Sequence, residues 1–126
     1  MTVVPLPRNT TRQAEGMLYG DVSRVIHRVT GAVIIAFVLV HVVVQTIMHV
    51  PAFAALKAGT PWLLPLQNQP WIHALLYFSI AFHTLHGLKL LAMELGVRVD
   101  YRLSLLFISS ASVLCALREV LRYAGV

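Results

Sequence analysis

The chain has 126 residues, which is enough for one domain, and 58% of them are hydrophobic whereas only 12% are charged. This composition excludes an ordinary soluble domain and predicts a protein of the lipid bilayer. The net charge of +5 does not indicate nucleic-acid binding, because the basic residues flank apolar runs instead of forming a patch with aromatics.

The N-terminal part of the chain, residues 1–24, is polar and contains two prolines. It has no apolar core followed by a small-residue cleavage site, so we expect no cleavable signal peptide. Residues 29–50 carry no Asp, Glu, Lys or Arg and, as a helix, would cover about 33 Å, enough to cross the hydrocarbon core. The sequence therefore predicts a first membrane helix over residues 25–50.

Pro51 is expected to end the first helix, and residues 51–69 read as an irregular loop or a short interfacial segment. A second helix is predicted over residues 70–95, with Pro70 in its first turn and Gly96 as its cap. The charged linker 97–102 is short, so a third helix, predicted over residues 103–123, must return antiparallel to the second. The expected fold is an all-α transmembrane three-helix bundle formed by one domain, residues 1–126.

Orientation is predicted from the basic residues that flank each span. Arginines cluster before the first helix, and further basic residues surround the second connection, whereas the first loop has only Lys57. We therefore expect a multi-pass protein of the cytoplasmic membrane with its N-terminus in the cytoplasm. The basic residues that carry this expectation are Arg8, Arg12, Arg24, Arg28, Lys89, Arg98 and Arg102.

Six histidines lie in or beside the first two helices, where ionisable residues are costly and usually line a site. Neutral imidazole is also the usual axial ligand of b-type haem, which helix bundles bind between their helices. Each histidine alone has the alternative of being a hydrogen-bonded packing residue. The single cysteine, Cys115, cannot form an internal disulfide.

Two local motifs make the histidine pattern specific. Residues 23–31, SRVIHRVTG, resemble the S-x-x-H-R-x-T-G signature of succinate dehydrogenase cytochrome b subunits. Residues 83–94, HTLHGLKLLAME, resemble the second signature of that family, H-x-x-x-G-x-R-x-x-x-x-D. Three positions depart from the pattern: the serine, Ser23, is displaced by one residue and its place is taken by Arg24, while Lys89 and Glu94 replace an arginine and an aspartate.

The resemblance implies a haem-carrying membrane anchor of a succinate:quinone oxidoreductase, complex II of electron transport and the tricarboxylic acid cycle. It implies His83 as axial ligand of the haem iron, Arg28 and His27 beside the haem propionates, and a quinone site with Arg28, Ser23 and Arg24. The second axial ligand would come from a second membrane subunit, and a flavoprotein and an iron–sulfur subunit would complete the assembly. The chain has no dinucleotide fingerprint and no cysteine cluster, so alone it should not oxidise succinate.

Gly87 lies one turn after His83 on the same helix face, which favours the close approach of a flat macrocycle, although close helix packing is the alternative. One haem is expected, and a second haem, if the complex has one, is predicted to lie on the outer side and to use His41, with His73 as its mate. If Arg28 and Lys89 mark the same depth, these histidines lie about 20 and 24 Å deeper. The alternative is that His41 hydrogen-bonds within the bundle and His73 lies at the outer interface.

Two other functions remain open from the sequence. The chain could be the cytochrome b anchor of a fumarate reductase or of another quinone-linked dehydrogenase, because partner subunits and potentials set the direction of the reaction. It could also be a non-redox membrane scaffold or transporter component whose histidines bind a metal or relay protons.

Overall fold

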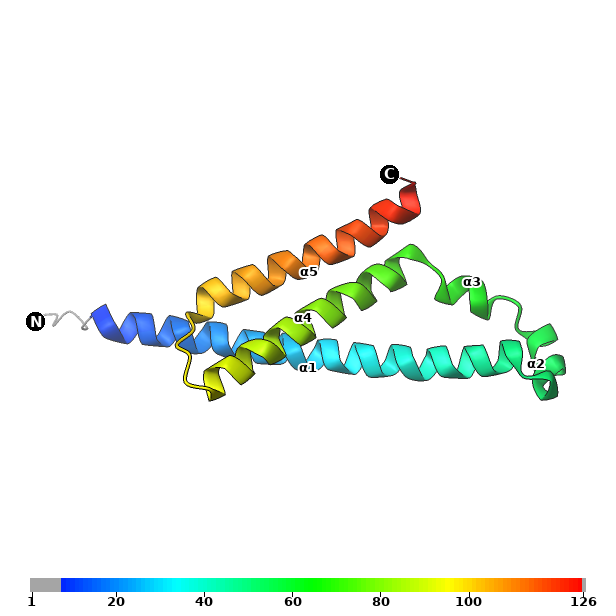
Figure 1. The fold of residues 1–126 in the computed structure, drawn as a ribbon, viewed down its shortest axis with the longest axis horizontal. Helices are drawn as coiled ribbons and strands as arrows, with labels where there is room; N and C mark the ends of the chain where they lie inside the picture. The colour runs from blue at the N-terminus through cyan, green and yellow to red at the C-terminus, as the bar shows by residue number, and fades with distance from the viewer. Residues whose placement is uncertain (1–7, 126) are drawn as a thin grey trace, which may run out of the picture.

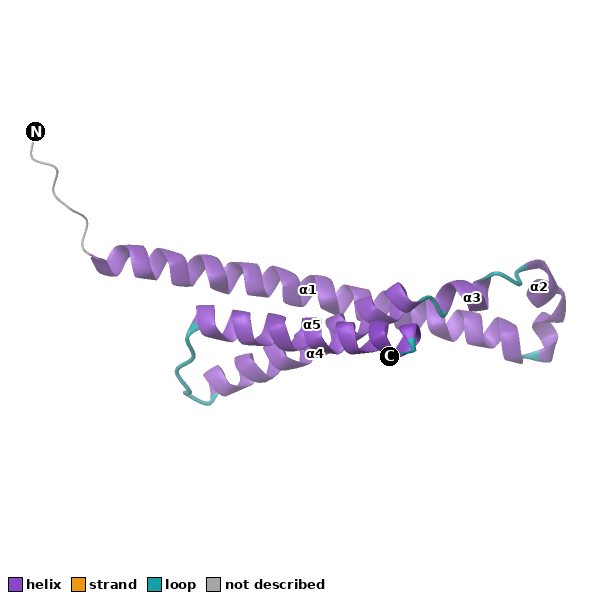
Figure 2. Ribbon diagram, turned by 90° about the horizontal axis from the view of Figure 1, so that it is seen from above, coloured by secondary structure: helices purple, strands orange, loops and turns teal. Residues whose placement is uncertain are grey.

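The computed structural model describes the backbone of residues 8–125 and the side chains of residues 13–125. Residues 1–7, where part of the signal-peptide expectation falls, and the side chains of Arg8 and Arg12 lie outside the described residues. The described part is all-α, as predicted, and contains no strand. Its elements are α1 (Arg8–His49), the short 3-10 helix η1 (Pro51–Phe53), α2 (Ala54–Gly59), α3 (Leu63–Gln67), α4 (Pro70–Glu94) and α5 (Tyr101–Ala124) (Figures 1 and 2).

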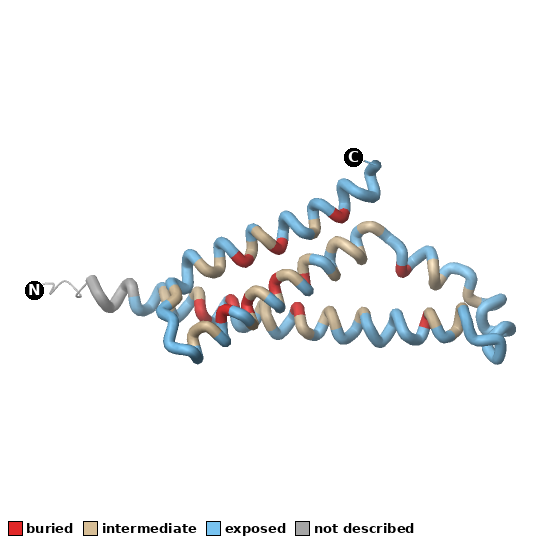
Figure 3. Tube along the Cα trace, viewed as in Figure 1, coloured by how far each residue is buried: buried red, intermediate tan, exposed pale blue. Residues whose placement is uncertain are grey.

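Three helices are long and apolar enough to cross a membrane, namely α1 from Gln13 onward, α4 and α5. Most of their apolar side chains are exposed, and the buried positions follow the contacts between helices (Figure 3). A soluble protein would bury such surface, because the hydrophobic effect penalises its contact with water. The chain is therefore a membrane protein whose exposed faces meet lipid or other membrane-embedded helices.

The first helix begins much earlier than expected, at Arg8 instead of near residue 25. Its 42 residues make a helix about 63 Å long, roughly twice the hydrocarbon thickness. Hydropathy marks only the part of a helix that suits lipid, whereas backbone hydrogen bonding continues through polar residues that have good helix propensity. No proline interrupts residues 8–49, so the helix extends beyond the apolar run.

The first connection was expected to be a loop or a short interfacial segment, and the structure builds it from η1, α2 and α3. Pro51 ends α1, as predicted, and stands at the first position of η1. The segment is tied back to α1 by the Gln67 amide, which donates to Nδ1 of His41 at 2.9 Å. This hydrogen bond holds α3 against the last third of α1.

Helices α4 and α5 form an antiparallel hairpin, and α1 crosses α4 at an angle (Figure 1). Gly96 adopts φ 87° after α4, which confirms the predicted glycine cap. The Asp100 carboxylate accepts from the backbone N–H groups of Arg102 at 2.9 Å and Leu103 at 3.1 Å, and so caps α5. This cap starts α5 at Tyr101, two residues before the predicted start, because the polar cap and not the apolar run decides where the helix begins.

Candidate functional site

The crossing of α1 and α4 brings the two sequence motifs together. His83 on α4 donates its Nδ1–H to the carbonyl oxygen of His27 on α1 at 3.2 Å. A carbonyl can only accept, so this contact places the ring hydrogen on Nδ1 and leaves Nε2 as the unprotonated nitrogen. Nε2 has no partner among the described residues and is not enclosed by them. A histidine oriented through Nδ1 with a free Nε2 is prepared to bind a metal ion.

The His83 ring is further held by two neighbours on α1. The His27 ring stacks on it with centroids 4.0 Å apart and planes 9° from parallel. Gly31 packs against the ring edge that carries Cε1 and Nδ1, because a Cβ at this glycine would lie 2.9 Å from Cε1 and 3.2 Å from Nδ1 of His83. Gly31, the last residue of the first motif, therefore leaves the space that the ring of His83, the first residue of the second motif, occupies.

The geometry leaves one oriented imidazole, that of His83, with an unprotonated nitrogen free of partners in the described part of the chain. The described residues contain no group of three or more His, Cys, Asp or Glu side chains that could hold a metal ion by themselves. A Cβ at Gly87 would meet nothing within 4 Å, so the helix face beside His83 is open. A metal centre at His83 would therefore need further ligands from outside the described residues.

His86 is a site residue that the sequence did not single out. It is 1% exposed, and its Nε2–H donates to the Ser23 hydroxyl oxygen at 3.1 Å. Ser23, 2% exposed, uses its own hydrogen on the Gly20 carbonyl at 3.0 Å, so it accepts from His86. His86 Nδ1 is then a buried acceptor without a partner in the described chain. The signal available in the sequence was its spacing, since residues three apart share a helix face.

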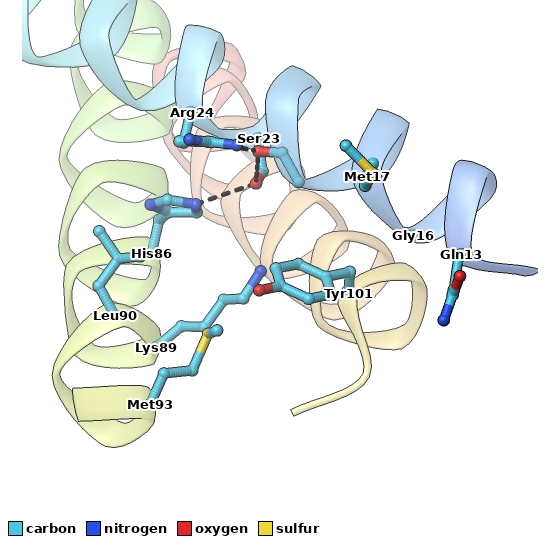
Figure 4. Close-up of a pocket in the computed structure, with 11 residues that line it drawn as sticks. Gln13, Gly16, Met17, Ser23, Arg24, His86, Lys89, Leu90, Met93 and Tyr101 are labelled. Atoms are coloured by element: carbon cyan, nitrogen blue, oxygen red, sulfur yellow. Dashed lines mark hydrogen bonds between the residues drawn. The ribbon is translucent and has the colours of Figure 1, made fainter. Parts of the chain in front are cut away.

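Beside the Ser23–His86 pair lies a pocket of about 590 Å³ formed by α1, the end of α4 and the start of α5 (Figure 4). Its volume is in the range of small-molecule sites. Lys89 enters it from α4, with its ammonium 4.5 Å from the centroid of the Tyr101 ring. The lining residues are Gln13, Gly16, Met17, Gly20, Ser23, Arg24, His86, Lys89, Leu90, Met93 and Tyr101.

The predicted quinone residues divide between two places. Ser23 and Arg24 line the pocket, whereas Arg28 is exposed on α1 and is not part of the lining. Arg24 is paired with the Asp21 carboxylate at 2.5 Å, and both side chains are largely exposed. Arg28 follows His27 on α1, and neither residue lines the pocket.

The structure does not bring the two outer histidines into one hydrogen-bonded group. His41 is exposed and bonds to Gln67, as the alternative reading predicted, while His73 Nδ1 shares a hydrogen bond with the Tyr123 hydroxyl of α5. The assumed depth reference also needs correction, because His83 and not Lys89 lies at the level of His27. Counted from His27, His41 lies 14 residues further along α1, about 21 Å. Counted from His83, His73 lies 10 residues back along α4, about 15 Å, so the two histidines differ in depth. The second-haem assignment stays a prediction.

Comparisons of the chain with protein-family models, with curated proteins and with solved structures found no match.

Proposed function

We propose that this protein is a haem b-binding membrane anchor subunit of a succinate:quinone oxidoreductase. The observation that carries the proposal is the contact between the two motifs, in which the His27 carbonyl orients His83 and leaves Nε2 free. Residues 56 positions apart meet at the places where the family resemblance expects a haem ligand and a residue beside a propionate. The adjoining pocket supplies a second site within the same helices.

In this proposal His83 provides one axial ligand and a second membrane subunit provides the other. His27 stacks on His83 and Arg28 follows it in α1, and a cation and an imidazole N–H would suit the haem propionates. A bound haem supplies one-electron redox chemistry at membrane depth. The iron–sulfur and flavoprotein subunits oxidise succinate, and the pocket at Ser23 accepts the quinone headgroup from the cytoplasmic half of the cytoplasmic membrane.

The test is the optical spectrum of the assembled complex purified through a tag on this chain. We expect a reduced-minus-oxidised difference spectrum of b type in the wild type and its loss or severe depletion in His83→Ala, because removal of the axial ligand leaves the iron open. His49→Ala is the matched control, since His49 is exposed and its ring bonds only to the Gln45 carbonyl.

Two outcomes would overturn the proposal. A colourless wild-type complex without quinone-linked succinate oxidation would favour a non-redox scaffold. Normal haem content and an unchanged low-spin spectrum in His83→Ala would assign the iron to other ligands.

A further inference from the structure

Lys89 is a buried cation without an anionic partner in the described chain. Its side chain is 7% exposed, and the ion pairs of the described residues are formed by Arg24 with Asp21 and Arg122 with Glu119. Its ammonium also makes no hydrogen bond to a described residue, and its contact is with the Tyr101 ring. A cation over an aromatic face gains only about 0.5–2 kcal/mol, less than the several kcal/mol that desolvation of an ion costs.

The surroundings of the Lys89 ammonium indicate what kind of ligand would supply its missing hydrogen-bond acceptor. Lys89 carries three N–H donors and no acceptor, so its missing partner is an oxygen. Figure 4 shows the ammonium at the Tyr101 ring, with Ser23 and His86 across the pocket. The pocket is lined mainly by apolar groups such as Met17, Leu90 and Met93. The ligand should therefore combine an oxygen acceptor with a flat or flexible apolar body.

A quinone fits these requirements better than a phosphate group does. The second cation of the pocket, Arg24, is already neutralised by Asp21, so the pocket offers one uncompensated positive charge. A phosphate normally recruits several charged donors, whereas a quinone carbonyl needs a single donor and presents an apolar ring beside it. Pockets of this kind carry few polar groups, and these fix the orientation of the ligand.

We propose that Lys89 is a positioning residue that donates a hydrogen bond to one carbonyl oxygen of the quinone headgroup, with Tyr101 holding the ammonium in place. This inference rests on the proposed function and deepens it, because the resemblance of Lys89 to a motif arginine assigns it no quinone contact. The Ser23–His86 hydrogen bond, one turn before Lys89 on α4, belongs to the lining of the same site.

The experiment compares Lys89→Met, Lys89→Arg and wild type in the purified complex, with a short-chain ubiquinone analogue as acceptor. Loss of a charge-assisted hydrogen bond of about 1.5–3 kcal/mol should raise the KM for the quinone about tenfold or more in Lys89→Met. Lys89→Arg keeps the charge and should lie closer to wild type. Lys57→Met is the matched control, because Lys57 is exposed in α2 and donates only to the Met48 carbonyl.

Haem content and succinate oxidation by a soluble dye are measured on the same samples, so that rates refer to assembled complex. An unchanged KM in Lys89→Met overturns the inference. An altered haem spectrum with an unchanged KM also overturns it and assigns Lys89 to a propionate. If the Lys89→Met complex does not assemble, Tyr101→Leu is tested in its place, and a smaller rise in the KM for the quinone is expected. An unchanged KM in Tyr101→Leu would then overturn the inference. Failure of the proposed function would instead be seen in the wild type, as absence of haem and of quinone reduction.

Discussion

At the scale of single residues, the arrangement around His83 depends on backbone atoms as much as on side chains. The His27 carbonyl fixes the tautomer, the His27 ring covers one face, and Gly31 leaves the space that the ring occupies. The same carbonyl oxygen also accepts from the Thr30 hydroxyl at 3.0 Å, so His83 shares this acceptor with a residue of the first motif. A ring held on several sides keeps its Nε2 in one direction.

We predict that Gly31→Ala displaces the His83 ring, because the new Cβ would lie 2.9 Å from Cε1 and 3.2 Å from Nδ1. Overpacking of this kind costs about 1–3 kcal/mol. A lower thermal midpoint of the detergent-solubilised complex, measured by loss of helical circular dichroism, is the expected result. Gly59→Ala serves as control, since a Cβ there meets nothing within 4 Å. Equal midpoints for the two variants would mean that the ring moves without cost.

Arg28 provides a second prediction at this scale. It lies beside His27 and outside the lining of the pocket, and its side chain is exposed in the isolated chain. We expect Arg28→Leu to impair quinone reduction more than succinate oxidation by a soluble dye, because in the proposed complex the flavin site would lie on another subunit. Equal losses in both assays with intact assembly would contradict this expectation.

At the scale of the elements, α1 differs most from α4 and α5. Its length of about 63 Å means that it cannot lie wholly in the hydrocarbon core unless it is strongly tilted. The Tyr101 ring packs against Gly20, with 3.5 Å from the ring carbons to the position of a Cβ, so the start of α5 lies level with that turn of α1. The part of α1 before Gly20 therefore continues beyond the start of α5 (Figure 1).

The order of the elements gives a prediction about topology. The segment with α2 and α3 carries one lysine, whereas basic residues flank the other ends of the helices, so this segment should face outward. A cysteine placed at Ala58, which is exposed, should react with an impermeant thiol reagent in intact cells, in a chain whose Cys115 is replaced by Ser. Labelling only after the membrane is broken would reverse the orientation.

At the scale of the whole molecule, the chain has a small interior and an extensive apolar surface. The buried apolar residues of the described part are Val44, Phe82 and Ile108, and small polar residues such as Ser79 and Ser112 lie at the contact of α4 with α5. Small side chains allow membrane helices to approach closely. The surface of such a molecule is suited to a lipid bilayer.

Haem stoichiometry is a property of the whole assembly. If His41 ligates a second haem, haem extracted per complex should fall from two to one in His41→Leu. If His41 only bonds to Gln67, as it does in this structure, the same variant should keep its haem and lose some stability through the unpaired amide. One haem in both wild type and variant would exclude the second site.

The sequence by itself determined the three spans, the proline that ends α1, the glycine after α4 and the residues that carry the family resemblance. These features are local, because they depend on hydropathy, backbone propensity and spacing along one helix. Only the tertiary structure decided that His83 meets His27, that His86 pairs with Ser23 and that Lys89 lies beside Tyr101. Counting residues along one helix could not predict these contacts, because the crossing of α1 and α4 decides which turns of the two helices lie at the same depth. That crossing depends on how the side chains of the two helices pack against each other.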